Sequence, residues 1–157
     1  LVPLLVAFFS EQPDSQVLEA YCGIGTFSLP LAAAGLDVLG LELQQASVDQ
    51  ARANAERNEL PKARFEQADV LTSLAVHLAW AESLLVDPPR KGLAPEVMDA
   101  ILKAPPKRIA YISCNPATLA RDLGLLSAAG YRIRPIQPVD FFPQTSHVEC
   151  VALLERD

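Results

Sequence analysis

Apolar runs rich in strand-forming residues alternate with helix-like segments along the whole chain. The expected strands cover residues 16–21, 37–43, 63–69, 83–87, 107–112, 131–139 and 148–154. The expected helices cover residues 26–34, 46–58, 70–80, 95–103 and 118–129. Strand and helix repeated at this spacing predict an α/β fold with a mostly parallel, seven-stranded sheet. The last two strands follow one another without a helix, so we expect a terminal hairpin with one antiparallel strand.

The strand interiors are apolar at both alternating positions, as in residues 83–86. This pattern favours burial of both faces of the sheet under helices. Half of the 157 residues are hydrophobic, which suits one domain with a single core over residues 1–157. The apolar start at residues 1–9 lacks a basic flank and is far shorter than the ~20 residues of a membrane span. We interpret it as a helix of a soluble protein, with no membrane partner.

Charge and cysteine content limit the classes of function. The chain has 13 basic and 19 acidic residues and a net charge of -6, the wrong sign for a domain that grips nucleic acid unaided. Any polyanion must therefore be held mainly by something else. The three cysteines are odd in number and lack metal-ligand spacing, which favours reduced thiols, a cytoplasmic location and no metal site in this chain.

Residues suited to ligand binding or chemistry follow five expected strands in turn. They are the Tyr21 to Thr26 segment, Glu42, Asp69, Asp87 and Cys114. In an open parallel sheet, ligands bind beyond the carboxyl ends of the strands. A single such residue is explained by a helix cap or a tight turn. Five in register favour a ligand site.

The glycine segment and the first acid favour a nucleoside ligand. Gly23 and Gly25 permit a tight turn and close approach of a ligand, although Gly-x-Gly alone is a weak signal. Ser28 occupies the region where a dinucleotide fingerprint has its third glycine, which weakens a pyrophosphate ligand. Glu42 follows Gly25 by 17 residues, near the spacing of an acid that bonds ribose hydroxyls. S-adenosylmethionine fits, since it carries no phosphate and needs an adenine contact such as Asp69.

These residues leave two enzyme classes open, an S-adenosylmethionine-dependent enzyme and a nicotinamide-dependent oxidoreductase. An oxidoreductase could use a similar sheet, but the sequence lacks the third glycine of its fingerprint, and that chemistry gives no role to Cys114.

Asp87-Pro88-Pro89-Arg90 follows a very apolar strand, and its two prolines fix a rigid loop able to present Asp87 to a flat base. A plain turn is the alternative explanation of this loop.

A thiol and a carboxylate complete the pattern. Cys114 follows an apolar strand and precedes Asn-Pro, close to a helix amino terminus that favours negative charge. Glu149 lies between apolar residues where the last strand begins. Together they suggest covalent catalysis with proton removal.

Four segments resemble, in this order, motifs of the catalytic domain of the RNA uracil-5-methyltransferases. They are Tyr-Cys-Gly-Ile-Gly-Thr-Phe at 21–27, Asp-Pro-Pro-Arg-Lys-Gly at 87–92, Ser-Cys-Asn-Pro-Ala-Thr at 113–118 and Phe-Pro-Gln-Thr-Ser-His-Val-Glu at 142–149. The resemblance covers nearly the whole chain and implies a Rossmann-like class I S-adenosylmethionine-dependent methyltransferase fold. The sequence of residues 137–140 resembles that of members acting on 23S rRNA more than that of members acting on the tRNA T-loop. A tRNA uracil-5-methyltransferase is the alternative.

The resemblance implies roles for individual residues. Cys114 becomes the nucleophile that adds to C6 of a uridine in structured RNA, and Glu149 becomes the acceptor of the C5 proton. The implied S-adenosylmethionine contacts are Tyr21, Gly23, Gly25, Thr26, Glu42, Asp69 and Asp87. The implied substrate contacts are Pro88, Arg90, Phe142 and His147, although His147 could be purely structural and Phe142 could belong to the core. Glu19 stands where the family often has Asp.

Family members also resemble one another in parts that precede this region. These are a segment with a cofactor-binding Gln, a middle domain and often an N-terminal RNA-binding barrel, and some members hold an iron–sulfur cluster there. The chain begins with Leu, and we expect it to be the C-terminal part of a longer protein that binds RNA, with no protein partner evident. A cofactor-binding module that is inactive alone is a further alternative. Cytosine-5-methyltransferases place their nucleophile after Pro, whereas Ser113 precedes Cys114 here.

Overall fold

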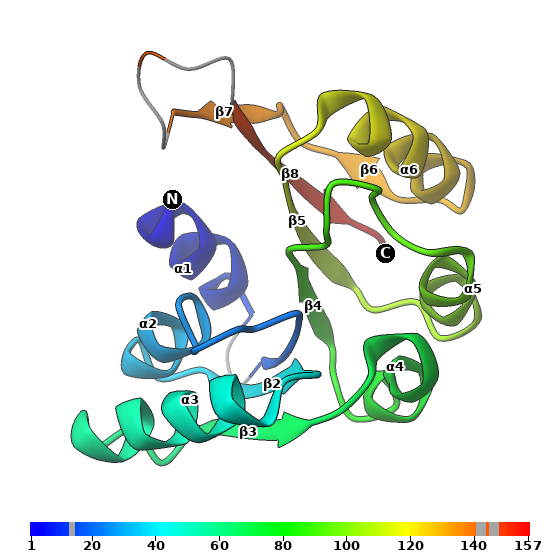
Figure 1. Cartoon of the computed structure of the whole chain (residues 1–157). Helices are drawn as coiled ribbons and strands as arrows, with labels where there is room; N and C mark the ends of the chain where they lie inside the picture. The colour runs from blue at the N-terminus through cyan, green and yellow to red at the C-terminus, as the bar shows by residue number, and fades with distance from the viewer. Residues whose placement is uncertain (13–14, 141–143, 145–147) are drawn as a thin grey trace.

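A twisted, mostly parallel sheet forms the centre of the molecule (Figure 1). The computed structural model describes residues 1–12, 15–140, 144 and 148–157. The strands are β1 (Gln16–Ala20), β2 (Asp37–Glu42), β3 (Ala63–Gln67), β4 (Ser83–Val86), β5 (Arg108–Ser113), β6 (Arg132–Ile133), β7 (Gln137–Val139) and β8 (Glu149–Glu155). The helices are α1 (Val2–Ser10), α2 (Ser28–Ala33), α3 (Gln45–Arg57), α4 (Val70–Leu78), α5 (Pro95–Lys103) and α6 (Pro116–Ala128).

The strand order is β3-β2-β1-β4-β5-β8-β6, with β7 also paired to β8. Strands β1 to β5 pair in parallel, and β8 runs antiparallel to its neighbours. The expected parallel α/β sheet with one antiparallel strand is therefore confirmed. The expected strand at 131–139 is two short strands, because Pro135, which lies between them, lacks the N–H that a continuous ladder needs. The described strands thus number eight rather than seven.

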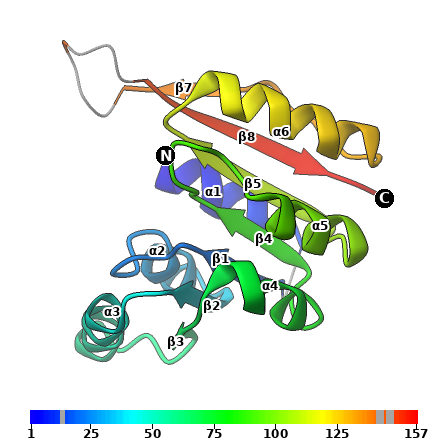
Figure 2. The same cartoon turned by 45° about the vertical axis from the view of Figure 1, so that its right-hand side comes forward.

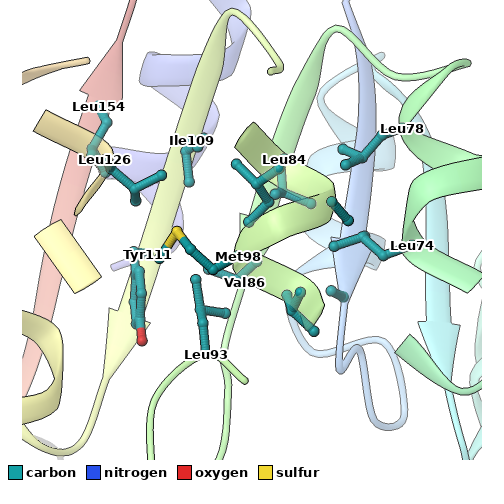
Figure 3. Close-up of a cluster of buried hydrophobic side chains, with 14 of the residues drawn as sticks. Leu74, Leu78, Leu84, Val86, Leu93, Met98, Ile109, Tyr111, Leu126 and Leu154 are labelled. Carbon is teal, nitrogen blue, oxygen red and sulfur yellow. The ribbon is translucent and has the colours of Figure 1, made fainter. Parts of the chain in front are cut away.

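Helices cover both faces of the sheet, as the apolar strands predict. Helices α1, α2 and α3 pack on one face, and α4, α5 and α6 pack on the other (Figures 1 and 2). Figure 3 shows the second interface, where Leu84 and Ile109 of the sheet meet Leu74 of α4 and Leu126 of α6. All four are at most 1% exposed. Burial of such side chains on both faces provides the main stabilisation of the sheet.

The strand order reverses between β1 and β4, which lie side by side. At such a switch point the connections leave the sheet in opposite directions and open a crevice at the carboxyl ends of the strands. The polar residues singled out in the sequence follow these strand ends. No helix in the described part of the chain combines the length and apolar character needed to cross a bilayer.

Candidate functional site

A cavity of about 630 Å³ opens beyond the carboxyl ends of β1, β2 and β3. Its walls come from the ends of these strands, the start of α4, the connection between β4 and α5, and one side chain of α6. Tyr21, Glu42 and Asp69 all line it, so the structure brings together three residues that the sequence assigned to cofactor binding. Most of the remaining wall is apolar, including Leu43 and Leu71, which are 61% and 47% exposed.

Glu42 links the end of β2 to the glycine turn that follows β1. Its Oε2 accepts a hydrogen bond from the backbone N–H of Gly23 at 3.1 Å, and its Oε1 accepts one from Gln44 N–H at 2.9 Å. Each carboxylate oxygen keeps a second lone pair, which is available to a hydroxyl in the cavity. The acid therefore both fixes the turn and presents acceptors to a ligand.

The glycine turn requires backbone conformations that favour glycine. Gly23 and Gly25 have φ values of 55° and 89°, in the left-handed region. A Cβ on Gly25 would lie 3.0 Å from Cζ of Phe65, so space as well as backbone geometry selects glycine there. Gly23 and Gly25 build the turn beside the cavity, and the exposed Thr26 follows them; none of the three lines the cavity.

Asp69 has two functions in the structure. It is the N-cap of α4, with Oδ1 accepting from Leu71 N–H at 2.9 Å. The helix-cap explanation of this acid is therefore correct, but it does not exclude a second role. It also lines the cavity, as Tyr21 does. Burial and the negative charge of Asp69 raise the pKa of Tyr21.

Cys114 follows β5, and Glu149 begins β8, the strand paired with it. In this antiparallel pair Ser113 lies opposite Cys150 and Ile112 lies opposite Val151. Continuing the register by one residue puts Cys114 opposite Glu149, where side chains point to the same face of the sheet. That face is the one covered by α1 to α3, because Ile112 and Val151 both belong to its core. Both Cys114 and Glu149 are half-buried.

Asp87 joins this pair from the neighbouring strand β4. It directly follows Val86 and is partly buried. Burial, followed by the negative charge of Glu149, raises its pKa to about 6. Two carboxyl groups that influence one another in this way must lie in the same region. Asp87, Cys114 and Glu149 thus lie at the ends of adjacent strands, and none of the three lines the cavity.

Helix α6 begins two residues after Cys114. Asn115 is its N-cap, with Oδ1 accepting from Ala117 N–H at 3.1 Å, and Pro116 is its first residue. The sequence interpretation started this helix at residue 118, two residues late. An Asn cap followed by Pro at the first helical position is the signal that would have located the true start.

The remaining predicted substrate contacts have different positions. Pro88 is buried and Arg90 is exposed, while the Arg90 carbonyl accepts hydrogen bonds from α6. Phe142 and His147 lie outside the described residues. Across residues 1–12, 15–140, 144 and 148–157, no three His, Cys, Asp or Glu side chains are grouped as a metal site.

Glu19, the departure from the family pattern at a position expected to orient the glycine turn, is a buried acid. It is 0% exposed, and its Oε2 accepts from the Ser28 hydroxyl. Its Oε1 has no hydrogen-bond partner within the described part of the chain. Burial, reinforced by the charge of Asp87 and opposed by the Ser28 bond, raises the Glu19 pKa to about 8. The folded protein therefore holds this carboxyl in its protonated form at neutral pH.

The Glu19→Gln variant should lose less stability than the wild type as pH rises. An unfolded chain releases the Glu19 proton near pH ~4.3, whereas the folded chain retains it up to about pH 8. The folded state binds more protons in this window, so its stability falls as pH rises through it. Urea unfolding of the ligand-free protein at pH 5 and pH 8 measures the difference. If the free energy of unfolding changed equally between the two pH values in the variant and the wild type, the raised pKa of Glu19 would be contradicted.

Several residues of the cavity wall were missed from the sequence, and two of them come from elements distant in the chain. Arg121 of α6 and Leu93 of the β4–α5 connection both line the cavity. Neither belongs to a recognisable motif position, because each reaches the cavity through tertiary packing rather than through a strand end. Only the approach of α6 to the β4–α5 connection reveals them.

Comparisons with known proteins show the relatives of this chain. The family model described as tRNA (Uracil-5-)-methyltransferase matches residues 6–157. An uncharacterized RNA methyltransferase of Gloeobacter violaceus is 55% identical over 143 residues, which is 91% of this chain and 31% of that protein. The 23S rRNA (uracil(1939)-C(5))-methyltransferase RlmD of Pseudomonas putida is 45% identical over 159 residues, which is 99% of this chain and 35% of that protein.

A solved structure agrees with these sequence matches. The Pyrococcus abyssi tRNA (uracil-54, C5)-methyltransferase in complex with S-adenosyl-L-homocysteine matches with a TM-score of 0.86 and 37% identity. The match covers 98% of this chain and 36% of that chain. The chain thus spans about a third of the length of the relatives that it matches. The expected methyltransferase fold is confirmed.

Proposed function

Because the chain belongs to the tRNA (uracil-5-)-methyltransferase family, we propose that the protein transfers a methyl group from S-adenosylmethionine to C5 of a uridine in structured RNA. The observation that carries this proposal is the register of β5 with β8, in which Ser113 lies opposite Cys150; continued by one residue, it puts Cys114 opposite Glu149. A nucleophile and a base on neighbouring strands can act on the same pyrimidine ring.

The cavity suits S-adenosylmethionine in size and in the chemistry of its wall. Its volume of about 630 Å³ lies within the range of ligand sites. Glu42 offers carboxylate acceptors for ribose hydroxyls, while Asp69 and the phenol of Tyr21 offer polar contacts to an adenine edge. The apolar wall suits the flat base, and the glycine turn lies next to the cavity. When bound, the cofactor supplies an electrophilic methyl group.

The side chains of the chain would provide the remaining chemistry. Cys114 adds as a thiolate to C6 of the uracil ring, and the C5–C6 π electrons move onto C5 and the O4 enolate. This makes C5 nucleophilic enough to accept a methyl group. Glu149 then removes the C5 proton, the C5–C6 double bond re-forms, and the Cys114 thiolate leaves. The target base must be turned out of its stack to reach both groups.

We propose 23S rRNA as the RNA, with tRNA as the alternative. Support for rRNA comes from the 45% identity to the RlmD protein of Pseudomonas putida, compared with 37% to the tRNA enzyme of Pyrococcus abyssi. The net charge of -6 suits a catalytic domain whose RNA is gripped mainly by other parts of a longer protein. The cytoplasm is the compartment that such a substrate implies. Any iron–sulfur cluster would belong to those other parts.

The Glu42→Gln variant should bind the cofactor more weakly. Its amide nitrogen would face a backbone N–H, either that of Gly23 or that of Gln44. One acceptor for ribose is lost and the glycine turn is released, which predicts a dissociation constant for S-adenosylhomocysteine raised about tenfold or more. Calorimetric titration provides the measurement. Glu82→Gln, at an exposed ion pair with Lys107, is the matched control, and an unchanged affinity of Glu42→Gln would contradict the role.

Methyl transfer itself tests the proposed function. The full-length protein is incubated with labelled S-adenosylmethionine and unmodified transcripts of 23S rRNA or tRNA, and the digested nucleosides are separated. We expect 5-methyluridine in the rRNA. Label only in tRNA would select the alternative RNA, and binding of NAD without any methyl transfer would favour an oxidoreductase. Transfer by the full-length protein but not by the 157-residue chain would assign this chain as a module inactive alone.

A further inference from the structure

Side chains of α6 bind the connection between β4 and α5 at several backbone groups. We call Asn115, Thr118, Arg121 and Asp122 the α6 clamp. The carbonyl of Arg90 accepts from Asn115 Nδ2 at 3.1 Å and from Thr118 Oγ1 at 3.3 Å. Arg121 Nη2 donates to the carbonyl of Lys91 at 3.1 Å and to that of Leu93 at 3.3 Å.

Asp122 is the buried centre of the α6 clamp, with a residue exposure of 1%. Its Oδ2 accepts from Leu93 N–H at 2.9 Å and from the Tyr111 hydroxyl at 2.7 Å. Its Oδ1 accepts from Arg121 Nε at 2.8 Å and forms an ion pair with Arg121 Nη2, also at 2.8 Å. A buried carboxylate is costly unless its oxygens are fully bonded. Here both oxygens are occupied, and they join α6, β5 and the β4–α5 connection at one point.

The connection packs against the α6 clamp without spare room. Gly92 has a φ of 77°, and a Cβ there would lie 2.6 Å from Asp122 Oδ2 and 2.8 Å from Arg121 Nη2. Figure 3 shows Tyr111 and Leu93 next to one another at the edge of the core. The backbone of the connection is therefore held by direct contact as well as by hydrogen bonds.

The β4–α5 connection and α6 contribute both to the cavity wall and to the turn that carries Cys114. Lys91, Gly92 and Leu93 line the cavity, together with Arg121 of the clamp. Asn115, the first residue of the clamp, directly follows Cys114 and caps α6. A displacement of the β4–α5 connection must consequently change the cavity wall and the turn that carries the thiol together.

We propose that Asp122 is a positioning residue that sets the cofactor cavity and the Cys114 turn relative to each other. The inference rests on the proposed function and adds to it: Asp122 does not line the cavity, and it acts on both steps through the α6 clamp. A residue that only shaped the cavity would alter cofactor affinity alone. A residue that only oriented the thiol would alter the rate of its addition alone.

Two isosteric variants test the proposal in the full-length protein. In wild-type Asp122, Oδ1 accepts a hydrogen bond from Arg121 and Oδ2 accepts one from Leu93 N–H. In Asp122→Asn an amide nitrogen replaces one of these oxygens, so it must face a donor and one hydrogen bond is lost. Tyr111→Phe removes one donor from the carboxylate and leaves the ring in the core. The matched controls lie away from the site: Asp37→Asn at a surface ion pair, and Tyr131→Phe, which removes a buried phenol bond to a carbonyl.

Two quantities are measured for each variant: the dissociation constant of S-adenosylhomocysteine, and the rate of covalent adduct formation with 5-fluorouridine RNA at saturating S-adenosylmethionine. Saturation removes any contribution of weakened binding to the rate. In both clamp variants we expect the dissociation constant to rise about tenfold and the adduct rate to fall about tenfold. The control variants should remain within about twofold of the wild type on both measures.

Other outcomes overturn the proposal in distinguishable ways. A change in only one quantity, or equal changes in clamp and control variants, removes Asp122 from a coupling role. Unfolding of both clamp variants at the assay temperature would make the role purely structural. If the wild type forms no adduct with Cys114 at all, the proposed function itself fails. If the wild type forms it and the clamp variants match its two values, only the inference fails.

Discussion

The Cys114→Ala variant should lose methyl transfer to RNA by a factor of ~10⁴ or more. Without the thiol, nothing adds at C6, and C5 of uracil is too weak a nucleophile to accept a methyl group by itself. The fold should be unaffected, because the side chain is small and half-buried at the end of β5. Transfer of labelled methyl groups to RNA by the full-length protein measures the loss.

Cys150→Ala is the matched control for this thiol. Cys150 pairs with Ser113 in the same strand pair, but it packs against the core cluster on the opposite face of the sheet. It should retain nearly all of the wild-type rate. A Cys114→Ala enzyme that turned over at a rate near that of the control would remove Cys114 from catalysis.

Glu149→Gln should stop the reaction at a later stage. Thiol addition and methylation do not need the carboxylate, whereas removal of the C5 proton does. We expect the variant to accumulate a covalent protein–RNA complex carrying the new methyl group, with turnover lowered by ~10²–10⁴. Denaturing gel electrophoresis after incubation with unmodified RNA and labelled cofactor reports the complex directly.

The position of Glu149 makes this result specific. The Gln side chain preserves the shape at the start of β8, so the alignment of β8 with β5 should be unchanged. Removing the charge also removes one cause of the raised Asp87 pKa, which should shift that pKa downward. Release of methylated RNA by Glu149→Gln at the wild-type rate would show that another group is the base. Asp87 would then be the candidate, because its carboxyl group interacts electrostatically with Glu149.

Much of the fold follows from local patterns in the sequence. Apolar runs on both strand faces predict a sheet between two helical layers, and the structure confirms this arrangement. The predicted bounds of helices and strands are wrong at two places where a proline determines the local structure. Pro116 starts α6 earlier than periodicity alone indicates, and Pro135 lies at the break that divides one expected strand into β6 and β7.

The candidate site was only partly predictable. Strand ends in a parallel sheet meet at one edge, so Tyr21, Glu42 and Asp69 could be grouped before any coordinates were known. The opposition of Cys114 and Glu149 depends on the antiparallel register of β5 with β8, which residue spacing does not determine. The contact of Asp122 with Leu93 joins residues 29 positions apart. Within its helix Asp122 looks like any solvated acid, and only tertiary packing shows that it is buried.

Peptide mapping of the trapped complex tests the central claim most directly. The full-length protein is incubated with S-adenosylmethionine and RNA containing 5-fluorouridine, whose fluorine cannot be removed as a proton, and is then digested and analysed by mass spectrometry. We predict that the peptide containing Cys114 carries the nucleotide together with an added methyl group. Methylation of normal RNA without any such adduct, or an adduct on Cys22 or Cys150 instead, would contradict the account.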